Sequence, residues 1–285
     1  MSGTALAITR GFYGRTLDLS RRPGAPAPGW DAMPECRAVR VVESCGGRGS
    51  EVRRLLTFVS ALDRARDADR LWDAAACLYR AQPWAFALLE VTNRTVDELR
   101  VTLRSAGVSQ RHGPDSDAWH RIARALESRT IAPAIYDAIE VGQGDADALL
   151  KGLQATRDRQ PLFPMLRGPK VSRMWVRMLA APGGATIRGL DSLPVAVDVQ
   201  VSKVTRYLGI LDVEGGCEGP TRQRVQDAWR RDVEAGGAEG PAPLGNTCAA
   251  LDPAIWFFGK WGCTFCERAR QRMPIAVVCE GCRLP

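Results

Sequence analysis

The sequence predicts a mainly α-helical protein, and three observations carry that prediction. Apolar residues recur every three or four positions through most of the chain after Ser50, which is the spacing of one helix face. Several of these stretches begin at a residue that favours helix N-caps, as Thr95 does. Apolar residues also make up 45% of the 285 positions, which is enough for a packed core. We therefore expect helices packed on helices.

Residues 1–50 are expected to form an irregular extension. Glycine, proline and arginine are frequent in this part, above all over residues 21–29, and that composition is typical of loops. We expect one or two short strands within it, for example at residues 38–43.

The helical pattern begins at Ser50, which suits an N-cap and is followed by apolar residues at 52, 55, 56 and 59. Further helices are expected at residues 67–80, 95–106, 115–127, 132–139 and 145–156. Pro161 and Pro164 then interrupt the run. After these prolines we expect a helix that opens at Lys170 and others at residues 200–211, 221–234 and 251–261, the last of them buried because it is apolar almost throughout.

The net charge of +7 and the pI of about 9.1 favour a nucleic-acid partner. Arginine outnumbers lysine, and the guanidinium group binds phosphate well. The sequence contains no apolar run of eighteen residues, so we expect no membrane span. Its start lacks the apolar core and cleavage site of a signal peptide. These features predict a cytoplasmic protein in a reducing compartment, associated with the nucleoid when it is bound to DNA.

Nine cysteines in such a compartment indicate metal binding rather than disulfides. Four of them form two C-x2-C pairs separated by twelve residues: Cys263, Cys266, Cys279 and Cys282. A pair with this spacing lets one tight turn direct both sulfurs at the same ion, and two pairs complete a tetrahedral site. Evenly paired knuckles favour structural zinc, with an iron–sulfur cluster as the alternative.

The stretch from 166 to 212 carries the strongest chemical signal. Lys170 follows Gly168 and Pro169 at the start of a helix, and an apolar run later delivers a single carboxylate, Asp198. A lysine amine can attack an electrophilic carbon while a carboxylate handles the protons. Short helices with basic first turns can also bind a phosphate backbone. The two features together predict an enzyme that acts on DNA.

This stretch resembles the helix-hairpin-helix DNA glycosylases, and among them the archaeal GO family that excises 8-oxoguanine. The core of the resemblance is Lys170-Val171, then the residues WVRML at 175–179, Pro194-Val195, Val197-Asp198 and GILD at 209–212. An upstream block contains Asn93, GVSQ at 107–110, Gly113 and Trp119, and a downstream block reads LDPAIWFFG at 251–259. The three blocks keep the family's order and span residues 90–262. The four-cysteine tail departs from that family.

The resemblance implies a fold of two helical subdomains with a cleft between them, here with the N-terminal extension and a small C-terminal metal knuckle added. The expected segments are 1–50, the glycosylase domain at 51–262 with its hairpin and catalytic block at 162–212, and the metal-binding tail at 263–285. Lys170 would be the nucleophile, and Asp198 would stabilise the positive charge that develops on the sugar.

The resemblance also implies residues that contact the DNA. Gln110 and Asp252 would read the edge of the extruded base, and Trp256 would stack on its face. The hairpin before Lys170 has one glycine where the family has a glycine–apolar–glycine turn, and Pro169 lacks an amide hydrogen. Phosphate binding is therefore assigned to Gly168 together with four basic side chains, those of Arg167, Arg173, Lys203 and Arg206.

The resulting prediction is a monomeric DNA glycosylase and AP lyase that excises a damaged purine, with 8-oxoguanine as the favoured substrate, from double-stranded DNA. The lysine would attack C1′, form a Schiff base with the opened sugar and cleave the strand by β-elimination. Two alternatives remain open at this point. The same scaffold could act on another modified base, such as a hypermodified base of viral DNA, or the chain could be a non-catalytic zinc-containing DNA-binding or regulatory protein.

Overall fold

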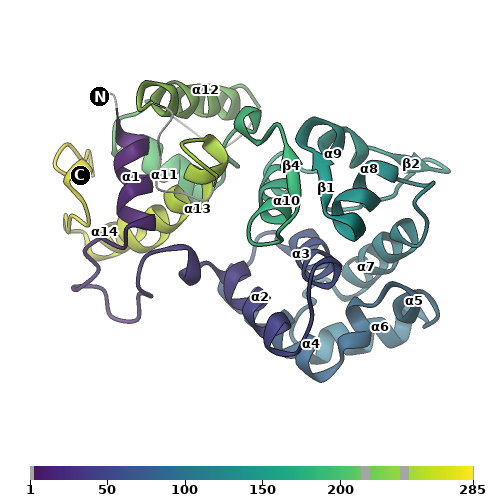
Figure 1. Ribbon diagram of the computed structural model, residues 1–285. Helices are drawn as coiled ribbons and strands as arrows, with labels where there is room; N and C mark the ends of the chain where they lie inside the picture. The colour runs from purple at the N-terminus through teal and green to yellow at the C-terminus, as the bar shows by residue number, and fades with distance from the viewer. Residues whose placement is uncertain (1–2, 213–218, 238–243, 285) are drawn as a thin grey trace. The chain divides into compact units, whose positions relative to one another are not determined.

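The computed structural model describes residues 3–212, 219–237 and 244–284, and the protein is mainly helical (Figure 1). The chain divides into two compact units. One comprises residues 34–189, and the other comprises residues 1–33 together with 190–285. The boundaries of these units differ from those of the three expected segments, because the N-terminal residues and the cysteine-containing tail belong to the same unit. In the described part of the chain no helix is long and apolar enough to cross a bilayer.

The unit of residues 34–189 is built around α3 (Ser50–Leu62), which is buried along nearly its whole length. Four helices pack against α3: α2 (Pro34–Ser44), α4 (Ala68–Ala81), α7 (His112–Leu126) and α10 (Val171–Ala180). An aromatic cluster fills the space beside α3, where Phe58 stacks on Trp119 with ring centroids 4.7 Å apart. The indole nitrogen of Trp119 donates a hydrogen bond to Ala85, so this buried ring leaves no polar atom unpaired.

Short elements complete this unit. Between α4 and α7 lie η2 (Pro83–Phe86), α5 (Leu88–Thr92) and α6 (Val96–Ser105). After α7 come α8 (Pro133–Tyr136), the π-helical turn η3 (Asp137–Val141) and α9 (Ala146–Gly152). Strand β1 (Gln143–Asp145) pairs in parallel with β4 (Thr186–Arg188), with Gly144 opposite Ile187. Strands β2 (Thr156–Arg157) and β3 (Gln160–Pro161) form an antiparallel hairpin ahead of α10.

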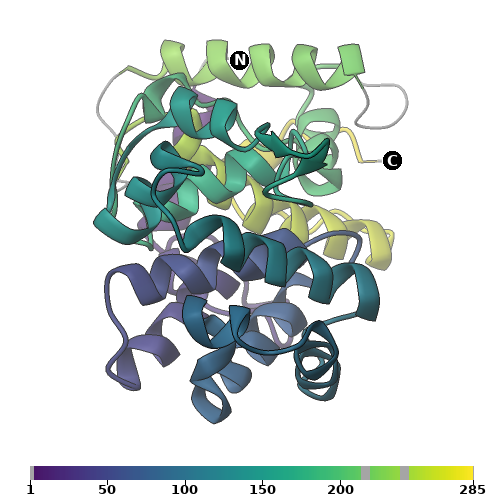
Figure 2. The ribbon, with the colours of Figure 1, turned by 90° about the vertical axis from the view of Figure 1, so that its right-hand side faces the viewer.

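The second unit is built around α13 (Cys248–Phe257), which contacts α1 (Thr4–Tyr13), α11 (Val199–Tyr207) and α12 (Gly219–Ala235). Figure 2 shows α12 along its length. The carboxylate of Asp232 on α12 accepts the amide hydrogen of Ala5 at 2.5 Å and so caps the first turn of α1. The buried indole of Trp229 donates to Thr205 on α11 at 2.8 Å. Shorter elements of this unit are η1 (Trp30–Ala32), η4 (Leu190–Ser192), the π-helical turn η5 (Phe258–Cys263), α14 (Thr264–Ala269) and η6 (Val277–Cys279).

The expected irregular extension is wrong, because residues 1–50 contain α1 and α2 and the strand expected at 38–43 lies inside α2. The valines of this stretch favour a strand locally. Val39 and Val42, however, share one helix face, and that face is buried in the unit where α2 packs against α4. Burial of that face overrides the local preference.

Most of the later helices are confirmed, with shifted ends. Thr95 caps α6 in a capping box with Glu98, and Asp67 caps α4. The helix expected at 145–156 stops at Gly152, since the chain then enters the β2–β3 hairpin. The buried helix expected at 251–261 begins three residues earlier, at Cys248, where Thr247 is the N-cap, and it widens into a π-helical turn after Phe257.

Candidate functional site

Lys170 occupies the N-cap position of α10, as the sequence predicted for the start of that helix. Two buried contacts hold α10 in its unit. The indole nitrogen of Trp175 donates to Thr57 on α3 at 3.0 Å, and Arg177 forms an ion pair of 2.9 Å with Glu35 on α2. Because both members of that ion pair are almost fully buried, the rotation and register of α10 are fixed, and with them the position from which Lys170 emerges.

The Lys170 ammonium group lies near a carboxylate that sequence reasoning missed. The distance from Nζ of Lys170 to Oδ2 of Asp63 is 3.8 Å. Asp63 is the C-cap residue of α3, and its side chain is 8% exposed, against 32% for that of Lys170. No motif marks Asp63 in the sequence, since its proximity to Lys170 arises from the packing of α10 against α3.

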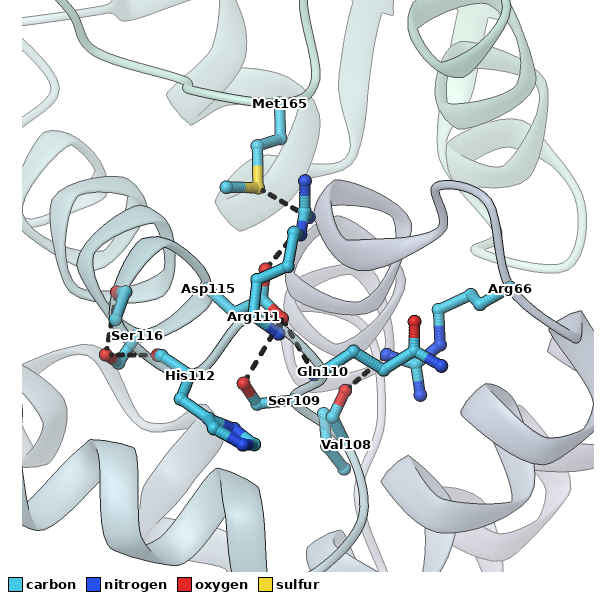
Figure 3. Close-up of polar contacts among 10 residues, drawn as sticks. Arg66, Val108, Ser109, Gln110, Arg111, His112, Asp115, Ser116 and Met165 are labelled. Atoms are coloured by element: carbon cyan, nitrogen blue, oxygen red, sulfur yellow. Dashed lines mark hydrogen bonds and ion pairs between the residues drawn. The ribbon is translucent and has the colours of Figure 1, made fainter.

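A short loop between α6 and α7 presents Gln110 (Figure 3). Asp115, which is 1% exposed, organises this loop from the first turn of α7. Its Oδ2 accepts hydrogen bonds from the Ser109 hydroxyl at 3.2 Å and from the amides of Gln110 and Arg111 at 3.0 and 2.9 Å. Its Oδ1 lies 2.8 Å from the Arg111 guanidinium. The loop is therefore braced by a buried, multiply bonded carboxylate.

Arg66 braces the same loop from the other side. Its guanidinium donates to the carbonyl oxygens of Val108 at 2.6 Å and Gly107 at 3.2 Å. Gly107 has φ +72°, a conformation that glycine adopts without strain. Burial lowers the pKa of Arg66, while the carboxylates of Asp115 and Asp63 act in the opposite direction.

The Gln110 side chain is exposed and extends away from Asp115 in Figure 3. Since the loop is held through the Gln110 backbone amide, the side-chain amide is not needed to hold it. The neighbouring Arg111 donates to the sulfur of Met165 at 3.2 Å, and Met165 lies five residues before Lys170. Gln110 and Lys170 thus belong to the same unit. The segments that carry them are in contact through Arg111 and Met165.

Asp198 is the N-cap of α11, and its Oδ1 accepts the amide hydrogens of Gln200 at 2.8 Å and Val201 at 3.0 Å. Both of these bonds end on one carboxylate oxygen, and the side chain is partly exposed. Asp198 belongs to the unit that contains α11, whereas Lys170 belongs to the other unit. The expected catalytic pair is thus supplied by two units of the fold.

Asp252 holds the segment that leads into Asp198. Its Oδ1 accepts the amide hydrogen of Ala196 at 2.7 Å, and its residue is 8% exposed. Gln226 on α12 holds the same segment by donating to the carbonyl of Val195 at 3.0 Å. Asp252 lies inside α13, whose N-cap is Thr247. Its expected contact with a base edge stays a prediction.

Trp256 is partly exposed, unlike its neighbours Ile255 and Phe257, which are buried. The ammonium group of Lys260 lies 4.9 Å from the Trp256 ring centroid and 5.5 Å from that of Trp261. The Lys260 cation thus makes cation–π contacts with two partly exposed aromatic rings.

The residues expected at the DNA backbone have different surroundings. Arg167 donates to Gln154 at 3.1 Å and Arg173 to the carbonyl of Pro169 at 2.5 Å, so both are engaged near the start of α10. At Gly168 an added Cβ would meet no atom within 4 Å, so close packing within the protein does not require glycine there. Arg167, Gly168 and Arg173 therefore lie close to Lys170 in the sequence, and the space around Gly168 is open.

Lys203 and Arg206 take part in a network that joins α11 to α14. Lys203 forms an ion pair of 2.6 Å with Glu267 and is 16% exposed, whereas Arg206 is exposed and lies over the Tyr207 ring at 4.7 Å. The hydrogen bond from Lys203, followed by that from Tyr207, holds the pKa of Glu267 below its usual range against the effect of burial. Lys203 therefore has a structural partner, and Arg206 is the more accessible cation.

The four tail cysteines line one pocket. Cys263 ends η5, Cys266 lies in α14, Cys279 ends η6, and Cys282 follows three residues later. Burial raises the pKa of Cys263, and the three other cysteines raise it further, so the four sulfurs are close enough to influence one another. The amide of Met273 donates to the sulfur of Cys266 at 3.4 Å.

Within the described ranges, no three cysteine, histidine or acidic side chains lie close enough to hold a single metal ion as they stand. The donor set is nevertheless four soft sulfurs around a common cavity, and its other walls are mainly apolar, with Phe258, Ile275 and Leu284 among them. Such a donor set fits zinc or an iron–sulfur cluster. Compared with family models, curated proteins and solved structures, the chain matches none.

Replacing Asp115 with alanine is expected to loosen the loop that carries Gln110. The change leaves the amides of Gln110 and Arg111 without their acceptor, at a cost of about 1–3 kcal/mol in the free energy of unfolding. Urea denaturation measures that loss, and hydrogen exchange should show faster exchange of these two amides. Asp117→Ala, on the exposed face of the same helix, is the matched control and should change stability by less than about 0.5 kcal/mol. Unchanged exchange at residues 110 and 111 in Asp115→Ala would contradict the bracing role.

Proposed function

We propose that this protein is a DNA glycosylase with AP lyase activity, of the helix-hairpin-helix type, that removes a damaged purine from double-stranded DNA. The observation that carries the proposal is Lys170. It is a partly exposed amine at the first turn of a helix that is firmly packed, in the same unit as an exposed amide on a braced loop. The resemblance in the order of the three sequence blocks and the net charge of +7 add support.

In the proposed reaction the neutral amine of Lys170 donates its electron pair to C1′ of a nucleotide turned out of the duplex. The bond between C1′ and the base nitrogen breaks, and its electron pair leaves with the base, which takes up a proton. The amine then loses its remaining protons as the C1′–O4′ bond opens and O4′ is protonated, which gives a Schiff base. Loss of a C2′ proton and departure of the 3′ phosphate complete the β-elimination.

Asp198 would stabilise the positive charge that develops at C1′ and O4′ and would move protons to and from the amine. Oδ1 of Asp198 bonds two amides of α11, which fixes the direction of the carboxylate. Lys170 and Asp198 belong to different units of the fold.

The proposed substrate is 8-oxoguanine. Gln110 can donate and accept hydrogen bonds at a base edge, and Trp256 offers a partly exposed ring for stacking. Asp252 is bonded to Ala196, so its support for the proposal lies mainly in holding the segment before Asp198. A base with a different edge, such as a hypermodified viral base, would form hydrogen bonds with the same Gln110 amide.

We also propose that Cys263, Cys266, Cys279 and Cys282 bind a structural metal centre. When bound, the centre would crosslink η5, α14 and η6 beside α11. The paired C-x2-C spacing favours zinc. A [4Fe–4S] cluster, which is held by four thiolates in the same way, is the alternative.

Lys170→Ala is expected to abolish base release, because the reaction loses its nucleophile. Single-turnover assays on duplexes that carry 8-oxoguanine, other oxidised purines or hypermodified pyrimidines should show a rate fall of at least about 10³-fold on the substrate that the native protein cleaves. Asp198→Asn should lower the rate by about 10²–10⁴-fold.

Lys151→Ala is the matched control for that experiment, because Lys151 is an exposed lysine of the same unit, paired with Asp147. It should leave the rate unchanged. Release of a hypermodified base in place of 8-oxoguanine would move the substrate assignment to that alternative. Tight DNA binding without release of any base, indifferent to Lys170→Ala and Asp198→Asn, would contradict the enzyme and favour a non-catalytic DNA-binding protein.

The metal proposal is tested by elemental analysis and absorption spectroscopy of protein purified without exposure to air. One zinc ion per chain with no visible absorption identifies zinc, whereas bound iron with sulfide and a broad visible band identifies a cluster. Cys279→Ala should lose the metal, and Cys45→Ala, which changes an exposed cysteine of the other unit, should keep it. Metal-free native protein would contradict the proposal.

A further inference from the structure

We propose that Asp63 is a positioning residue for Lys170, whose buried carboxylate holds the lysine ammonium group in a fixed direction before DNA arrives. Asp63 has no counterpart in the residues that the sequence singled out. The inference deepens the proposed function and rests on it for its catalytic consequence, although the ion pair itself can be tested without any DNA.

The first support is the contrast in burial across the pair. The Asp63 side chain is 8% exposed and that of Lys170 is 32% exposed, with 3.8 Å between Oδ2 and Nζ. A buried carboxylate is costly unless a cation or hydrogen-bond donors compensate it. Asp63 therefore gains from keeping the Lys170 ammonium group nearby, and Lys170 gains a defined direction while its end stays accessible.

The second support is that each of the two residues lies at the end of a packed helix. Asp63 directly follows α3, and its amide donates to the carbonyl of Ser60 at 3.2 Å, which closes the last turn of the helix. Lys170 directly precedes α10. Since α3 and α10 are locked together by the buried bond between Trp175 and Thr57, neither end of the pair depends on a long surface loop.

Charged groups on the described elements that contact α10 have the following surroundings. On α3, Arg53 bonds the carbonyls of Ile139 and Gly183, and Arg54 pairs with Glu140. On α9, Lys151 pairs with Asp147, and on β4 the Arg188 side chain is exposed. On α10 itself, Arg173 bonds Pro169 and Arg177 pairs with Glu35. Arg66 is the second cation on which the Asp63 charge acts.

Two consequences follow for the lysine. A long flexible side chain that is already oriented loses less entropy when it attacks, so the maximal rate should depend on Asp63. A nearby negative charge also favours the protonated amine, so the lysine should give up its proton at higher pH than it would without Asp63. Removal of the charge is thus expected to lower the maximal rate and, at the same time, to make the amine neutral at lower pH.

The experiment compares the full-length native protein with Asp63→Asn, which keeps the side-chain shape and removes the charge. Amines are labelled with an acylating reagent over a range of pH, and the extent of labelling at Lys170 is read by mass spectrometry of its peptide. We expect the midpoint of Lys170 labelling to fall by about one pH unit or more in Asp63→Asn. Asp63→Glu keeps the charge and should retain most of the native midpoint.

Lys151 is the internal control in each digest. Its pKa is raised by the hydrogen bond that it donates to Asp147, and that pair is exposed on the surface, so Asp63→Asn should leave its midpoint unchanged. If Asp63→Asn fails to fold, a second measurement on the native protein still tests the ion pair. In about 1 M salt the Lys151 midpoint should fall, whereas the Lys170 midpoint should hold, because salt screens an exposed pair more strongly than one with a buried member.

The catalytic consequence is read from the pH dependence of single-turnover base release. Asp63→Asn should lower the plateau about 10-fold and shift the acidic limb to lower pH by the same amount as the labelling midpoint. A Lys170 midpoint that does not move in Asp63→Asn, or that falls in salt together with that of Lys151, would overturn the inference. A shifted midpoint in a protein that releases no base would support the ion pair and refute the glycosylase, so the two failures are distinguishable.

Discussion

The buried contact between α3 and α10 is the constraint on which the proposed chemistry depends. Trp175 donates to Thr57 at 3.0 Å inside the core, and the buried ion pair of Arg177 with Glu35 fixes the same helix from its other side. Such contacts allow one register, because a shift of α10 would leave buried polar groups unpaired. That register puts Lys170, before α10, within 3.8 Å of Asp63, after α3.

A comparable arrangement holds the carboxylate of the other unit. Asp252 on α13 bonds the Ala196 amide, which directs the short segment that ends at Asp198. A Cβ on Gly259 would come within 2.9 Å of Gln200, so glycine there allows η5 to pack closely on the first turn of α11. In each unit a core helix thus anchors one candidate group, which is the Lys170 amine in one unit and the Asp198 carboxylate in the other.

Local sequence signals predicted most of the helices and the Thr95 cap, because that cap acts through neighbouring amides. The expected N-cap at Ser50 is wrong, since Ser50 is the first residue of α3 and Gly49 is its N-cap. Local signals failed at residues 38–43, where burial of Val39 and Val42 outweighs strand preference. They also missed Asp63 and Asp115, whose roles depend on partners brought close by the fold. Lys203 is a basic residue in the sequence, yet its pairing with Glu267, 64 positions later, required the structure. The separation of Lys170 and Asp198 into two units likewise has no sequence signature.

The central claim is that the amine of Lys170 becomes covalently joined to the sugar of a damaged nucleotide. Borohydride reduction of the native protein during reaction with a duplex that it cleaves tests this claim most directly, since it converts a Schiff base into a stable amine. The account predicts a crosslinked species whose modified peptide contains the sugar remnant on Lys170. A crosslink that maps to another residue, or none on any modified duplex, would contradict it.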